Sequence, residues 1–489
     1  MLHLRLIRSG YHLCRRTVDR IRLNIPACRR MDERKRREQA LDAWLSRGPL
    51  KNGSGKTYVI LNHHYDLDIE AMARADTDHT LWSAGFDLFE GVRNYFPPSQ
   101  RDLNAVYGDE SMKKTLDRYR EEFVRPFVRR IMSEVRPDGL MAPSDIFFWF
   151  RPILQEFQRQ GVPAVVQDKE GTLVVNAGWM KDHAANLRRK YPPCSDRYFF
   201  WNRTQEKWYG WLGLSPELGE VIGQPRSDFF FHADRWPSRG DLGLPASGPV
   251  VLAFTFDATA YSGQGISSQP AATQPKPWAT LRTGMHSALR SIAVDYPAAQ
   301  MIVKAHPQQT DIADVRGELD SFAMENMRLI TGSTTGSHLI VNADVIVGFQ
   351  STALIEAMLT DKPVIYAGWT QEALSAESQL LQFSASGACV VAENQEHLES
   401  LIKDALRGDL VPNAEMMRRR AEFTDQYFYR ADGHVCERFL SAVDSFVDSL
   451  AGKWAIDRRV SIENNRAEVH STPVHSMRAD DQKRPPRLW

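Results

Sequence analysis

A histidine, a turn rich in small residues and a glutamate occur along residues 301–369 at spacings that suit phosphate and ribose binding. The histidine, His306, follows the apolar run MIVKA. The turn follows a second apolar run and contains Gly348, Gln350, Ser351 and Thr352. If a helix begins at this turn, its unpaired N–H groups, its dipole and two hydroxyls favour an anion, most naturally a phosphate or diphosphate.

Glu356 lies four residues after Thr352, so on a helix both side chains project from the same face. A carboxylate in this place can accept hydrogen bonds from both hydroxyls of a ribose. Lys304 adds a positive charge two residues before His306. We therefore expect a nucleotide to be bound by Lys304, Pro307, Gly348, Gln350, Ser351, Thr352, Glu356 and Arg226.

The elements that must position these residues form a strand, turn, helix, strand pattern. Residues 301–305 are apolar apart from Lys304 and include β-branched side chains, and the strand stops at His306 because Pro307 cannot donate to a sheet ladder. Beyond them, two further buried strands at 343–349 and 361–368 enclose a helical stretch. This is a parallel βαβ unit, in which ligands gather beyond the carboxyl ends of the strands.

The sequence KAHP followed by GFQSTALIEAMLTDKPVI resembles the C-terminal half of the GT-B glycosyltransferases. It is similar in particular to the bacterial surface-polysaccharide group, which includes capsule transferases, polysialyltransferases and CDP-glycerol glycerophosphotransferases. Over residues 58–450 the resemblance implies an α/β fold with two Rossmann-like domains facing across a cleft. It also implies that His306 stabilises the departing nucleotide phosphate without a metal or another cofactor. Alternatively, His306 only ends a strand and the Ser351-Thr352 pair only caps a helix.

A second acidic site follows the expected strand at 162–167. The turn DKEGT places Glu170 before Gly171, where rigid backbone can present a carboxylate as a general base. The pair resembles the acidic-acidic-glycine motif of polysialyltransferases, in which the acid before glycine is the presumed base. Lys169 stands here in place of the usual middle acid. The alternative is an acidic turn that Gly171 stabilises.

Three further motifs could each have a functional or a purely structural role. Arg226 lies in a segment that resembles the GxPRxD segment of surface-carbohydrate proteins. Its planar guanidinium can bind a phosphate with two hydrogen bonds, although it could equally pair with Asp228.

Asp66 and Asp68 have the DxD form of a metal site, but they come directly after the first strand, so a polar loop is the better interpretation. GSGKT at 53–57 precedes a strand instead of following one, which excludes a P-loop.

The first 50 residues hold 13 Arg and Lys against 5 Asp and Glu, although the whole chain is neutral. Apolar residues at partly helical spacing among these arginines predict an amphipathic segment on an anionic membrane surface. A basic helix packed against its own domain is the alternative. Aromatic residues that could stack on bases are sparse in this segment, so no nucleic-acid partner is expected.

The composition is that of an ordinary soluble globular protein, with 43% hydrophobic and 25% charged residues. The five cysteines show no metal-like spacing and favour a reducing compartment. No run of about 18 apolar residues occurs. These features predict a cytoplasmic protein, peripheral at the inner face of the cell membrane.

The expected domain organisation follows the composition shifts. It comprises a basic segment at 1–50, a Rossmann-like acceptor domain at 56–231, a linker at 232–249, a Rossmann-like nucleotide-sugar domain at 250–410, helices crossing back at 411–450 and a disordered tail at 457–489.

The resemblance to these families implies a glycosyltransferase. Glu170 would deprotonate an acceptor hydroxyl on a growing surface polysaccharide or a lipid-linked acceptor, and the donor would be a nucleotide-activated sugar or polyol phosphate. One alternative is a nucleotide-sugar epimerase of related fold, which needs no polymer acceptor. Another is a non-catalytic assembly factor of a capsule complex.

We predict from the sequence that Glu356→Ala weakens nucleotide binding by roughly 10 to 150-fold, because charge-assisted hydrogen bonds to the ribose are lost. The fold is expected to survive. A nucleotide titration of the folded variant measures the effect, and wild-type affinity would contradict the ribose role.

Overall fold

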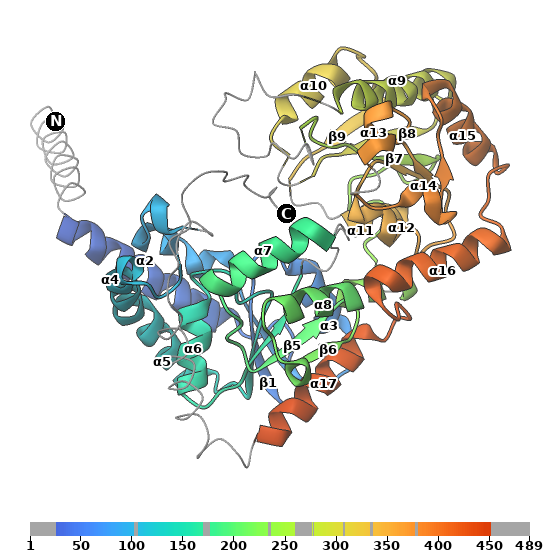
Figure 1. Cartoon of the computed structure of the whole chain (residues 1–489). Coiled ribbons are helices and arrows are strands. Elements are labelled where there is room, and N and C mark those ends of the chain that lie inside the picture. Colours follow the sequence, from blue (N-terminus) through green and yellow to red (C-terminus); the bar gives the residue numbers. More distant parts are fainter. Residues whose placement is uncertain are drawn as a thin grey trace, which may run out of the picture. The chain divides into compact units, whose positions relative to one another are not determined.

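The computed structural model describes residues 26–101, 106–169, 177–232, 236–259, 276, 278–306, 309–332, 336–376 and 380–450. These residues form two sheets of six strands each, which confirms the predicted α/β fold with two Rossmann-like domains (Figure 1). Internal contacts divide the chain into a first unit within 1–64 and 78–164 and a second unit within 65–77 and 165–489. None of the described helices combines the length and apolarity that a membrane crossing requires. The domain boundaries given above stay predictions.

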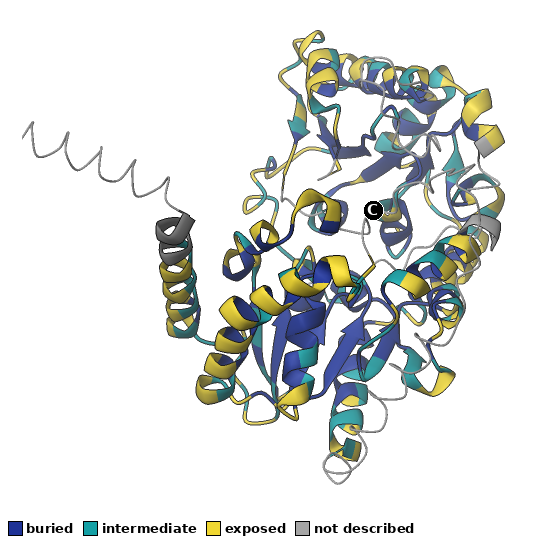
Figure 2. Cartoon of the chain, turned by 60° about the vertical axis from the view of Figure 1, so that its left-hand side comes forward, coloured by how far each residue is buried: buried dark blue, intermediate teal, exposed yellow. Residues whose placement is uncertain are grey.

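The first sheet has the strand order β2-β1-β3-β4-β5-β6. Its strands are β1 (Thr57–Leu61), β2 (Thr80–Ala84), β3 (Gly139–Ala142), β4 (Ala164–Gln167), β5 (Arg197–Phe200) and β6 (Gly219–Val221). Pairings along it are parallel, as between β1 and β2 or between β4 and β5. Strands β3 and β4 are buried along their whole length, which explains why they are apolar almost throughout and do not alternate. Buried residues are dark blue in Figure 2.

The second sheet has the strand order β12-β11-β10-β7-β8-β9 and lies wholly in the second unit. Its strands are β7 (Val250–Phe254), β8 (Gln300–Lys304), β9 (Met327–Ile330), β10 (Val345–Gly348), β11 (Val364–Tyr366) and β12 (Val390–Val391). Every pairing described in this sheet is parallel. The three strands expected around residues 301–368 are therefore confirmed as β8, β10 and β11.

Helices and single turns connect the strands. In the first unit they are α2 (Pro26–Arg47), η1 (Phe86–Phe89), η2 (Val92–Tyr95), η3 (Pro98–Gln100), α4 (Glu110–Tyr119), η4 (Arg120–Val124), α5 (Arg125–Glu134) and α6 (Arg151–Arg159). In the second unit they are α3 (Asp66–Arg74), α7 (Ala177–Lys190), α8 (Arg203–Trp211), η5 (Pro216–Leu218), η6 (Pro225–Phe231), α9 (Ala279–Asp295), α10 (Ile312–Asp320), α11 (Gly336–Asn342), α12 (Thr352–Ala357), α13 (Gln371–Ala376), α14 (Phe383–Ser386), α15 (Gln395–Arg407), α16 (Ala414–Phe428) and α17 (Val435–Leu450).

A π-helical turn, η4, joins α4 to α5. Pro126 follows it, and a proline in a helix has no N–H to donate and crowds the carbonyl four residues earlier. The wider turn relieves that conflict. Phe123, in η4, stacks on Tyr119 and on Phe127 with ring centroids 5.4 Å apart in both pairs, so the apolar stripe continues through the turn.

Helix α2 is fixed to the first unit by Trp44. This side chain is 3% exposed, its indole N–H donates to the carbonyl of Ser83 at 2.7 Å, and its ring lies 4.9 Å from that of Trp82. The C-terminal end of α2 therefore packs against its own domain, the alternative considered for the basic segment. The preceding residues, 1–25, lie outside the described part of the chain.

We predict that Trp44→Ala lowers the free energy of unfolding by about 3–5 kcal/mol, because a large buried side chain leaves a cavity. Leu50→Ala is the control, since that side chain is 56% exposed. Urea denaturation followed by circular dichroism measures both variants. Equal midpoints would show that Trp44 does not anchor α2.

Candidate functional site

The predicted nucleotide-binding residues converge on one edge of the second sheet. Strand β7 lies between β10 and β8, and Phe254 at its end is in register with Gly348 on one side and Lys304 on the other. Since neighbouring strands are about 4.8 Å apart, Gly348 and Lys304 lie roughly 10 Å apart. His306 and Ser351 follow directly at this carboxyl edge, which is where ligands bind in parallel sheets.

The turn after β10 is held in place by buried contacts. Gln350 has a positive φ of 41° and is 3% exposed. Its side-chain N–H groups donate to the Tyr366 hydroxyl and the Leu381 carbonyl, both at 2.9 Å, and its side-chain oxygen accepts from the Leu381 N–H. The amide therefore braces the turn. A Cβ at Gly348 would lie 3.3 Å from the side chains of Leu354 and Phe254, so this position suits glycine.

Two hydroxyl residues begin α12. Ser351 is its N-cap and accepts from the N–H of Ala353 at 3.2 Å, while Thr352 is exposed. The helix is only six residues long, shorter than the predicted stretch. Its dipole is correspondingly small, so the hydroxyls and N–H groups of the turn, and not a long helix, are what a phosphate would meet.

Lys304 ends β8 with a buried ammonium group. The residue is 3% exposed, and Nζ donates to the carbonyls of Ala305 at 2.7 Å and Gly332 at 3.2 Å. Within the described residues no carboxylate forms an ion pair with it. Burial lowers its pKa from the ordinary lysine value. Two residues on, His306 is exposed, and its carbonyl accepts from the Gln309 N–H at 3.0 Å.

A chain of buried charges connects α3, η6 and α12. The Arg226 guanidinium donates to Asp68 at 3.2 Å and to Glu356 at 2.9 Å, and it lies over the Trp201 ring at 4.7 Å. The second carboxylate oxygen of Glu356 accepts from the Ser337 hydroxyl at 2.6 Å. Both oxygens of Glu356 thus already have protein partners, and a ribose would have to replace one of them.

Burial and the neighbouring charges shift the pKa values of Asp68 and Arg226. Burial raises the pKa of Asp68, and Arg226 only partly offsets the rise. Burial acts to lower the pKa of Arg226, but Glu356 and then Asp68 raise it above its usual value. The expected polar loop at Asp66 and Asp68 is wrong, because both residues lie in the first turn of α3 and Asp68 is buried. No cluster able to hold a metal occurs among the described residues.

Arg226 does not pair with Asp228, the alternative considered from the sequence. Asp228 accepts instead from the N–H groups of Val435 and Cys436 at 2.9 and 2.8 Å, at the start of α17. Two predicted residues, Glu170 and Pro307, lie outside the described part of the chain. Asp168, two residues before Glu170, is buried and accepts a hydrogen bond from the Tyr209 hydroxyl.

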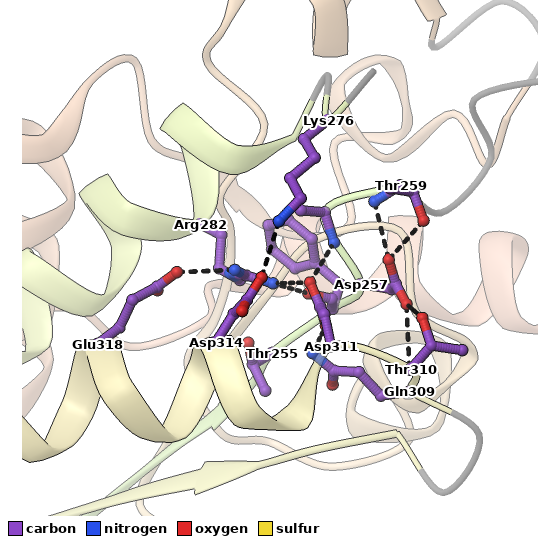
Figure 3. Close-up of polar contacts among 12 residues, drawn as sticks. Thr255, Asp257, Thr259, Lys276, Arg282, Gln309, Thr310, Asp311, Asp314 and Glu318 are labelled. Atoms are coloured by element: carbon purple, nitrogen blue, oxygen red, sulfur yellow. Dashed lines mark hydrogen bonds and ion pairs between the residues drawn. The ribbon is translucent and has the colours of Figure 1, made fainter. Parts of the chain in front are cut away.

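Figure 3 shows a polar network that sequence reasoning missed. Asp257, after β7, accepts from the N–H of Thr310 at 3.1 Å, and Arg282 of α9 is ion-paired with Asp311 and with Glu318. Burial acts to raise the pKa of Asp257, but hydrogen bonds, including those from Thr310, lower it. The network ties the loop after β7 to the loop after β8. Its only signal in the sequence was the position of Asp257 directly beyond an apolar run.

Comparison with known proteins gives structural likeness only. No family model and no curated protein matches the sequence. UDP-GlcNAc 2-epimerase from Neisseria meningitidis, solved bound to UDP-GlcNAc, aligns with 80% of this chain and 100% of its own at 13% identity and a TM-score of 0.43. The enzyme of the same name from Methanocaldococcus jannaschii aligns with 80% of this chain and 100% of its own at 13% identity and a TM-score of 0.46. The one from Rickettsia bellii aligns with 81% of this chain and 97% of its own at 14% identity and a TM-score of 0.41. These proteins are epimerases by name, which contradicts the predicted glycosyltransferase, and that assignment is not kept.

We predict that Glu356→Ala lowers the free energy of unfolding by about 3–5 kcal/mol, since it leaves the guanidinium of Arg226, whose side chain is only 17% exposed, with one carboxylate fewer. This revises the expectation that the fold is indifferent to the change. Glu415→Ala is the control, because Glu415 pairs with arginines on the surface of α16 and its loss should leave unfolding unchanged. Denaturant unfolding of both variants measures the effect. Equal midpoints would show that the ion pair of Arg226 with Glu356 does not stabilise the fold.

Proposed function

We propose that the chain is a nucleotide-sugar epimerase that binds a nucleoside diphosphate at the common carboxyl edge of β8, β7 and β10. The observation that supports this most directly is the ammonium of Lys304. A buried cation with only carbonyl partners is costly, as its lowered pKa records. A diphosphate beside it would supply the missing negative charge.

The neighbouring residues extend this proposal to the rest of the nucleotide. His306, exposed two residues beyond Lys304, would donate to a phosphate oxygen, as imidazole readily does near neutral pH. Ser351 and Thr352 would add hydroxyl and N–H donors. Glu356 would take the ribose hydroxyls by exchanging its bond with Ser337.

Epimerisation inverts one carbon of the sugar and transfers nothing to an acceptor. A proton leaves this carbon on one face and a proton is added on the opposite face, so one group must accept a proton and a second group must donate one. Glu170 remains the proposed proton acceptor, on the grounds of its place after β4 in the sequence. UDP-GlcNAc is the first substrate to test, because the epimerases compared above act on it by name.

We predict that the protein converts UDP-GlcNAc into its epimer without an acceptor, and that Lys304→Met slows the conversion at least about tenfold through weaker substrate binding. Lys114→Met, on the exposed side of α4, is the matched control and should retain activity. Proton NMR of the reaction follows both sugars. Release of UDP only after an acceptor is added would contradict the proposal.

The same variant separates a binding role from a folding role. Because burial lowers the pKa of Lys304, the folded state holds this proton less tightly than the unfolded state. The cost is fully present below the folded-state pKa and vanishes as pH rises through 10.5. Lys304→Met should therefore be about 0.5–2 kcal/mol more stable at pH 7, and the difference should shrink above pH 10.5. A variant that is less stable and inactive would point to a structural lysine.

A further inference from the structure

A cavity of about 320 Å³ lies in the first unit between α2 and the helix formed by α4, η4 and α5. We name it the α2 cavity. Its floor is apolar and consists of Leu41, Leu88, Phe123, Pro126 and Phe127. The volume falls in the range of small-molecule sites, roughly 300–1,000 Å³. Every lining residue belongs to the first unit, so the cavity is separate from the proposed nucleotide residues in the second unit.

The π-helical turn contributes Phe123 to the floor of the cavity. Phe123 lies in η4, and its stack with Phe127 presents two rings on one side of the helix. Leu41 approaches from α2 and is only half-buried, so it is reachable from the opening. π-Helical turns are rare and are frequent at functional sites, which makes this an unusual place for a void left by chance packing.

The rim of the cavity carries three arginines, Arg34, Arg37 and Arg130, and three acidic residues, Glu38, Asp42 and Glu122. Arg34 pairs with Glu38 at 2.9 Å, and Arg130 pairs with Asp42 at 3.2 Å. Arg37 donates to the Tyr95 hydroxyl, and its guanidinium lies 5.7 Å from the Phe123 ring centroid, where rim and floor meet. Exposed ion pairs of this kind contribute little to stability, so an incoming phosphate can replace the carboxylates at small cost.

The charge of α2 favours an anionic occupant. The helix holds seven Arg and Lys against four Asp and Glu, and Lys35 and Arg36 are exposed beside the rim. An apolar floor below three rim arginines, beside a helix of net positive charge, matches a molecule with a hydrocarbon tail and an anionic head. It does not match a small polar metabolite, which would leave the floor without apolar contacts.

We propose that the α2 cavity binds one acyl chain of an anionic membrane phospholipid. The chain lies on the apolar floor, and the phosphate contacts Arg34, Arg37 and Arg130. The neighbouring basic residues of α2 add attraction to the anionic surface, on the order of 1 kcal/mol for each residue near it, and this attraction weakens with salt.

Flotation of the full-length protein with vesicles tests the proposal. Phosphatidylcholine vesicles containing phosphatidylglycerol should bind the protein, and vesicles of phosphatidylcholine alone should bind it weakly. Leu41→Glu should reduce binding to the anionic vesicles at least about tenfold, because a carboxylate on the floor repels the chain. Leu45→Glu adds the same charge one turn along α2, at a half-buried position outside the cavity, and should bind nearly as wild type.

Each outcome supports or contradicts lipid binding in the α2 cavity. Equal loss in both variants would reduce the interaction to surface charge, and no loss in a folded Leu41→Glu would remove the cavity from it. If Leu41→Glu does not fold, Leu41→Trp fills the cavity without a charge and should weaken binding in the same way. Full competition by glycerol phosphate would show a phosphate site that needs no acyl chain, and it would overturn the proposal. Epimerase activity is measured alongside, because loss of lipid binding should leave it unchanged.

Discussion

Parallel pairing on both sides of β7 is the constraint on which the candidate site depends. Because Phe254 is in register with Gly348 and with Lys304, the segments that leave β8 and β10 start from adjacent places at one edge. Two stretches of sequence more than 40 residues apart are thereby brought within reach of one ligand. The network around Asp257 and Arg282 then fixes how the loops leave that edge.

Three cations in the second unit show how differently a fold can neutralise charge. Arg226 lies between two carboxylates, whereas Lys304 and Arg420 donate to carbonyls. Burial lowers the pKa of Arg420 to about 10, and its partners, the carbonyls of Thr360 and Ala388, show that it anchors α16. Carbonyl partners alone therefore do not make a ligand site. Lys304 differs in its position, since it lies at the edge where parallel sheets receive their ligands.

Apolar patterning was sufficient to predict β8, β10 and β11, because strands buried on both faces of a parallel sheet are nearly continuous apolar runs. It was not sufficient to predict what the polar residues do. The four-residue spacing from Thr352 correctly places Glu356 on α12, but its partners Arg226 and Ser337 come from distant segments that no local pattern connects. Gln350 is a similar case, because its bracing of the turn depends on Leu381.

The assignment of a reaction failed for a different reason. Short motifs such as KAHP report how a chain ends a strand and meets a phosphate, and proteins with different chemistry on similar folds share that need. The motifs therefore supported a nucleotide-sugar site, but they did not distinguish a transferase from an epimerase. What separates these reactions is the group that faces the sugar, and the residue proposed for that role, Glu170, lies outside the described part of the chain.

The π-helical turn also bears on how the aromatic stripe is recognised. Tyr119, Phe123, Phe127 and Ile131 recur every four residues, whereas an α-helix repeats every 3.6 residues, so each step of four overshoots by about 40°. Over three steps the drift would carry the last side chain about a third of the way around the helix. A single wider turn absorbs much of this rotation and keeps all four side chains buried. A strict repeat of four residues that continues past three turns and contains a proline therefore indicates a change in helical phase.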